Sequence, residues 1–149
     1  MRTGKWAPAK LQGEANTSNY LVAFQGDKVT IDVEKTLNYS GSNWDAISSG
    51  NIFSFYMNDR LIQSFSTADV NPVALVSAAQ HEGEGKGFVH FYSTSNADNF
   101  NRIVIEQNDG SGFESDNHSF HAGTGKFAPT LVPEPSIVLG LATIGSTLR

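Results

Sequence analysis

Short apolar runs recur along the chain, and each is bounded by Gly, Asn, Asp or Ser. In several runs apolar and polar residues alternate, as where Thr30 and Asp32 separate Val29, Ile31 and Val33. A period of two is typical of a strand with one buried face. The pattern predicts strands over residues 20–24, 29–33, 52–56, 61–65, 88–92, 102–106 and 113–120.

The segments between these runs have turn chemistry. Residues 57–60 read as a hairpin connection, and residues 108–112 supply types that tolerate a positive φ. Residues 68–80 place valines at roughly helical spacing around Pro72, so we expect a single turn or a short helix there. Seven short strands separated by turns predict an all-β fold, an antiparallel β-sandwich or jelly roll.

The chain divides into four parts by composition. We expect residues 19–127 to form the β-sandwich, residues 128–131 a linker, and residues 132–149 a short C-terminal tail. Residues 1–18 lack an apolar run long enough for a signal peptide. We therefore expect the N-terminal segment to be incomplete.

Composition narrows the function classes. Charged residues make up 17% of the chain, and Gly, Asn and Ser are abundant, which disfavours a helical protein. The net charge of -5 repels phosphates and argues against nucleic acid as a partner. Because the chain has no cysteine, disulfides and thiolate metal sites are excluded.

The tail has three parts: Val132-Pro133-Glu134-Pro135-Ser136, an apolar stretch from Ile137 to Leu148, and Arg149. Proline on both sides of Glu134 holds the backbone extended, in a form that a processing enzyme can grip. The tail resembles the PEP-CTERM sorting signal of Gram-negative bacteria, which exosortases recognise. The resemblance implies export, a transient membrane anchor, exosortase as a partner, and a final place at the cell surface or outside the cell.

The tail departs from the family pattern in two ways. Its apolar stretch has 12 residues, against about 20 for a full membrane span, and one arginine replaces a cluster. We therefore expect the sorting signal to be truncated. A last β-strand, a buried helix, or a cytosolic protein with a chance tail remain as alternatives.

Residues 19–121 are similar to the domain that accompanies such tails in many cyanobacterial proteins. The resemblance is carried by Tyr20-Leu21, by residues 43–47 and 51–56, and by residues 112–117. It implies an extracellular β-sandwich without an established activity. The end of this region also resembles carbohydrate-binding jelly rolls, in which an Asp of the last strand holds a structural calcium ion.

The residues that match this calcium position are Asp116 and Asn117, whose side chains offer the oxygen ligands that calcium prefers. In the alternative reading, the two residues form hydrogen bonds to a neighbouring loop and fix the register of the last strand. Sugar binding has its own candidates: Trp44, flanked by Asn43 and Asp45, combines an aromatic face with polar groups in an expected loop. In the alternative interpretation, the Trp44 side chain is buried and fills one end of the sandwich core.

Catalytic signals are weak. Glu82 and Glu84 lie in a glycine-rich segment, and Glu106 and Glu114 fall on two strands that a short turn would make adjacent. His118 and His121 would point to opposite faces of a strand, which disfavours a shared metal.

We expect no enzyme. The first hypothesis is a surface or matrix protein that binds polysaccharide. A purely structural surface component is the second hypothesis, and a polysaccharide-cleaving enzyme the third.

Overall fold

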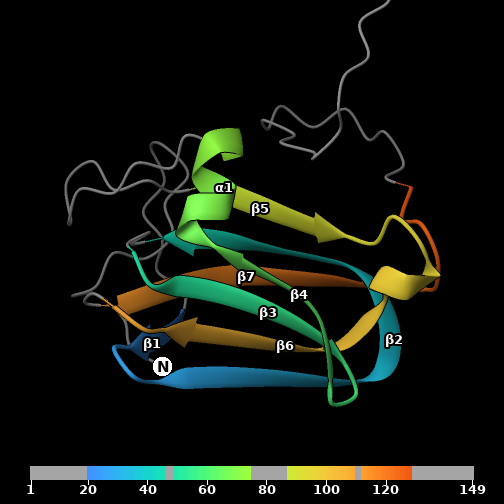
Figure 1. The fold of residues 1–149 in the computed structure, drawn as a ribbon, viewed down its shortest axis with the longest axis horizontal. Coiled ribbons are helices and arrows are strands. Elements are labelled where there is room, and N and C mark those ends of the chain that lie inside the picture. The colour runs from blue at the N-terminus through green and yellow to red at the C-terminus, as the bar shows by residue number, and fades with distance from the viewer. Residues whose placement is uncertain (1–19, 46–48, 75–86, 110–111, 129–149) are drawn as a thin grey trace, which may run out of the picture.

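The computed structural model describes residues 20–45, 49–74, 87–109 and 112–128, and these form an all-β fold (Figure 1). Each predicted strand is present. The strands are β1 (Leu21–Phe24), β2 (Lys28–Asp45), β3 (Asn51–Met57), β4 (Arg60–Ser66), β5 (Gly87–Tyr92), β6 (Phe100–Gln107) and β7 (Gly112–Ala122). A helix, α1 (Thr67–Ala74), follows β4, and a 3-10 turn, η1 (Asn96–Asp98), precedes β6.

Strand β2 belongs to both layers of the sandwich, because its two halves pair with different strands. Its first half, from Lys28 to Asp32, pairs with β6, and its second half, from Tyr39 to Trp44, pairs with β5 on one side and β7 on the other. The layers therefore read β2-β6-β3-β4 and β1-β7-β2-β5, all antiparallel. In Figure 1, β2 runs along the bottom, turns at the right and returns behind. The predicted antiparallel sandwich is confirmed.

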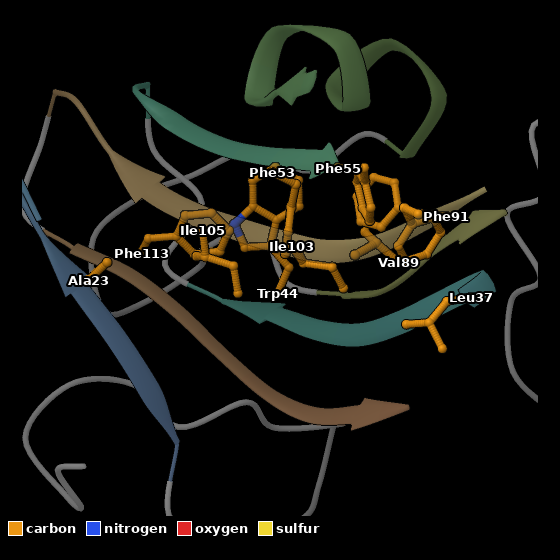
Figure 2. Packing of buried hydrophobic residues seen from close by; sticks show 11 residues of the cluster. Ala23, Leu37, Trp44, Phe53, Phe55, Val89, Phe91, Ile103, Ile105 and Phe113 are labelled. Atoms are coloured by element: carbon orange, nitrogen blue, oxygen red, sulfur yellow. The ribbon is translucent and has the colours of Figure 1, made fainter. Parts of the chain in front are cut away.

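Aromatic rings from both layers fill the space between them (Figure 2). Phe53 of β3 contacts Trp44 at 5.1 Å, Phe91 at 4.9 Å and Phe113 at 4.9 Å between ring centroids, so one ring joins three strands of the opposite layer. Offset and edge-to-face contacts of this kind add to the hydrophobic stabilisation of a core. Ile105 of β6 completes this centre with no exposed surface.

Strand β4 is an edge of the first layer, and strand β5 is an edge of the second. Within the described residues, β4 pairs with β3 alone and β5 with β2 alone. Helix α1 begins where β4 ends, and the Ser66 amide and hydroxyl donate to the Asp69 carboxylate at 2.8 and 2.7 Å. This cap fixes the helix start. The predicted helix is confirmed as far as Ala74, and residues 75–80 lie outside the described ranges.

Strand β7 contains a bulge near its middle. Gly41 of β2 pairs with Ser119, but Asn43 pairs with Asp116, so β7 carries one extra residue between these pairs. Asn117 takes the left-handed conformation there, with φ +50°, and its amide donates to Asp116 Oδ1 at 2.6 Å. Asn adopts this conformation more readily than most residues do.

Candidate functional site

A cavity of about 320 Å³ opens between the edge strands β4 and β5. We call it the β4–β5 cavity. Its lining comes from four strands and from the loop that contains η1. The lining residues are Phe55, Ile62, Gln63, Phe65, His90, Phe91, Tyr92, Thr94, Asp98 and Phe100.

Phenylalanine rings make the floor of the β4–β5 cavity. Phe55 and Phe91 lie 4.9 Å apart between centroids, Phe65 and Phe91 5.1 Å, and Phe55 and Phe100 4.9 Å. Figure 2 shows Phe55 and Phe91 meeting from opposite layers. These rings offer π faces and edges but no hydrogen-bonding groups. The floor therefore suits either an apolar face or a cation.

The loop before β6 supplies a fixed carboxylate to the cavity. Asp98 Oδ2 accepts bonds from the amide and hydroxyl of Thr94, at 2.9 and 2.6 Å, and from those of Ser95, at 2.9 and 3.2 Å. The bonds from Thr94 and Ser95 hold the pKa of Asp98 below its ordinary value of 3.8. All four bonds end on Oδ2, which leaves Oδ1 without a hydrogen bond in the described part of the chain.

The other polar groups of the lining come from the edge strands. His90 Nδ1 shares a hydrogen bond with the Tyr39 hydroxyl at 2.9 Å, and partial burial lowers the pKa of this histidine. Tyr39 in turn stacks on Phe127, with 4.6 Å between centroids, so the His90 ring is held by a packed partner. Gln63 lines the cavity from β4 and is exposed to solvent.

In the part of the chain that the structure describes, the lining contains one acidic residue and no lysine or arginine. Its volume is at the low end of the range for small-molecule sites, roughly 300–1,000 Å³. An apolar floor beside a few fixed polar groups is typical of sites that orient a small ligand. The cavity is therefore suited to one ring-sized, hydroxyl-bearing group that is neutral or cationic.

The predicted sugar-binding residues lie elsewhere. Trp44 was expected in a loop, but it lies in β2 and is 0% exposed, so that placement is wrong. Its ring stacks on Phe113 at 5.2 Å, which is the core role that the alternative reading gave it. Asn43 is buried beside it, Asp45 ends the same strand, and a binding role for these residues stays a prediction.

The structure brings the two predicted ligand sites together, because Asn43 is the cross-strand neighbour of Asp116. Asp116 and Asn117 form the bulge of β7, and this bulge sets the register of the strand. Within the described residues, no three His, Cys, Asp or Glu side chains are grouped to hold a metal ion. A structural calcium ion at Asp116 and Asn117 stays a prediction.

The paired carboxylates do not meet as expected. Glu106 lies on β6 opposite Lys28 and Ile52, whereas Glu114 lies on β7 opposite Val22 and Asp45, so their strands are not neighbours. Glu114 is 1% exposed, so its carboxylate is buried in the fold.

Glu82 and Glu84 lie outside the described residues. Both histidines lie in β7: His118 Nε2 meets Ser115 Oγ at 3.1 Å, and His121 Nδ1 meets Asn38 Oδ1 at 2.7 Å.

The sorting motif, Val132 to Ser136, also lies outside the described residues. No helix in the described ranges has the length and apolar character needed to cross a membrane.

Sequence reasoning missed the β4–β5 cavity. Ser95-Asn96-Ala97-Asp98 has the spacing of a capping box, a signal that could have marked the start of η1 and the fixed carboxylate. The approach of Asp98 to the edge strands depends on long-range pairing, which local patterns do not encode.

Comparisons with protein-family models, curated proteins and solved structures find no match for this chain. The resemblance to exosortase-sorted proteins therefore stays a prediction from the sequence.

Proposed function

We propose that the chain is an exported cell-surface or extracellular-matrix protein, sorted by an exosortase, whose β-sandwich binds polysaccharide in the β4–β5 cavity. The observation that carries the binding proposal is the cavity itself, with phenylalanine rings as its floor and Gln63, Thr94 and Asp98 among its polar lining. Sugars combine apolar C–H faces with a rim of hydroxyl groups. The phenylalanine rings can pack against the C–H face, and the polar lining residues can form hydrogen bonds with the hydroxyl groups.

The size of the site limits how much of a polysaccharide it holds. About 320 Å³ accommodates a single sugar ring, with the rest of the chain outside. We therefore expect the cavity to recognise the terminal sugar or a single sugar unit of a polysaccharide. Several protein molecules that bind one polymer would raise the apparent affinity.

The binding proposal is tested with the full chain on a panel of soluble polysaccharides, measured by affinity electrophoresis. Gln63→Trp places a bulky side chain in the β4–β5 cavity and should abolish retardation. Leu61→Trp is the matched control, because Leu61 lies on the same strand, is 51% exposed and does not line the cavity. Equal retardation of both variants would remove the cavity as the binding site.

The export proposal rests on Val132-Pro133-Glu134-Pro135-Ser136. Expression in an exosortase-positive bacterium and in its exosortase deletion tests it by surface labelling of cells. We expect surface protein in the first strain only, and loss of processing in Pro135→Ala. The same labelling in both strains would contradict sorting by an exosortase.

The same binding and labelling experiments also distinguish two other functions. A purely structural surface component predicts no retardation with any glycan while surface labelling persists. A polysaccharide-cleaving enzyme predicts shorter products after incubation.

A further inference from the structure

The charge of the β4–β5 cavity indicates which sugars it accepts, and this inference rests on the proposed polysaccharide binding. Among the lining residues that the structure describes, Asp98 is the one carboxylate, and none is a lysine or an arginine. His90, the other group that titrates near neutrality, is held toward its neutral form by burial. A carboxylate-bearing sugar would therefore be repelled by Asp98, and no described lining residue offers a lysine or arginine to offset that repulsion.

The geometry of Asp98 favours a ligand group that donates a hydrogen bond to its carboxylate. Thr94 and Ser95 fix the carboxylate through Oδ2, so Oδ1 keeps its capacity to accept hydrogen bonds without the carboxylate having to reorient. A ligand ammonium group would make a charge-assisted hydrogen bond there, which is about twice as strong as a bond from a hydroxyl.

The phenylalanine floor of the cavity, like the carboxylate of Asp98, favours a cationic ligand. Phe55, Phe65 and Phe91 present aromatic surface to the cavity from both layers. Aromatic faces attract a cation electrostatically, most strongly where water is excluded, and they also pack against the C–H face of a sugar ring. A sugar that carries an ammonium group uses both properties at once.

We propose that the β4–β5 cavity selects a sugar unit with a free amino group, such as an unacetylated hexosamine, with Asp98 Oδ1 as the acceptor for its ammonium. The same ring with an acetylated amine or a hydroxyl at that position binds more weakly, because it lacks the charge. A uronic acid is excluded.

The test is calorimetric titration of the full chain with short oligomers of glucosamine, N-acetylglucosamine, glucose and galacturonic acid. We expect the glucosamine oligomer to bind about tenfold more tightly than the two neutral ones. Asp98→Asn keeps an oxygen to accept from Thr94 and Ser95 but removes the charge, and it should bring the three affinities together. Asp27→Asn is the matched control, since it changes net charge equally at an exposed turn outside the cavity.

A second measurement keeps the proposal falsifiable if Asp98→Asn does not fold. Raising NaCl from about 20 to about 300 mM should weaken binding of the glucosamine oligomer severalfold and leave glucose binding unchanged. Equal affinity for glucosamine and glucose oligomers, or tighter binding of galacturonic acid, overturns the selection while leaving sugar binding in place. Absence of binding to every glycan, including the polysaccharides, removes both proposals.

Discussion

At the scale of single residues, two glycines share a backbone conformation but differ in their surroundings. Gly26 has φ +83° and Gly50 φ +86°. A Cβ at residue 26 would meet nothing within 4 Å, whereas one at residue 50 would overlap the backbone of Asp109 and lie 2.6 Å from Gln107 Oε1. Gly50 is therefore required for space as well as for conformation.

We predict that Gly26→Ala lowers the free energy of unfolding by about 1–2 kcal/mol, the cost of the left-handed conformation. Gly50→Ala should cost roughly 3 kcal/mol or more, because a backbone must also move. Urea denaturation of both variants measures the difference. Equal losses of unfolding free energy in the two variants would show that the backbone near Asp109 can move aside at no energetic cost.

Two histidines make stability depend on pH. Burial lowers the pKa of both His90 and His118 from 6.5, while Asp116 partly offsets the shift at His118. The unfolded chain therefore binds more protons than the folded chain near and below pH 6.5, so stability is full above that pH and decreases as pH falls. We expect a lower melting temperature at pH 5.5 than at pH 7.5, and a smaller difference in His118→Gln. A pH difference unchanged in His118→Gln would assign the effect to other groups.

At the scale of elements, period-two patterning was sufficient to predict each strand, because alternation such as Val29-Thr30-Ile31 reports burial directly. It failed where a strand is polar. Residues 38–43 read Asn-Tyr-Ser-Gly-Ser-Asn, which has loop composition, yet they lie inside β2 with most of their side chains buried. Pairing with β5 and β7 on both sides overrides local propensity there, and this is why Trp44 was misplaced.

The bulge of β7 allows a test of the calcium prediction. If Asp116 and Asn117 hold an ion, the full chain should melt several degrees higher in calcium than in EDTA, because the ion binds the folded state alone. Asp116→Ala should remove that difference. Asn117→Gly, which keeps the left-handed conformation but lacks the side-chain oxygen, separates ligation from strand geometry. Identical melting of the wild type in calcium and in EDTA would leave the pair with the structural role alone.

At the scale of the whole molecule, β2 takes part in both layers, and the β4–β5 cavity lies between the strands that form one edge of each layer, β4 and β5. The sequence allowed a sandwich to be predicted, but not which strands would form its edges. That order follows from where β2 bends between Asp32 and Leu37, and from pairings between residues more than fifty positions apart, such as Ile52 with Glu106. The candidate site is a product of strand order, which explains why no local motif pointed to it.

Strand order also predicts how amide protection is distributed. Strand β6 is paired on both sides, by β2 and β3, whereas β4 and β5 each have one partner in the described residues. Hydrogen exchange followed by NMR should find the slowest amides in β6, and fast and slow amides alternating along β4 and β5, because an edge strand directs every second N–H away from its partner.

Uniformly slow exchange along β4 and β5 would mean that another strand pairs with these edges. It would then cover the β4–β5 cavity, and the sugar site would have to be sought elsewhere. Fast exchange at these edges that slows when a glycan is added would instead connect β4 and β5 with ligand binding. The experiment therefore tests the architecture and the location of the site with the same set of amides.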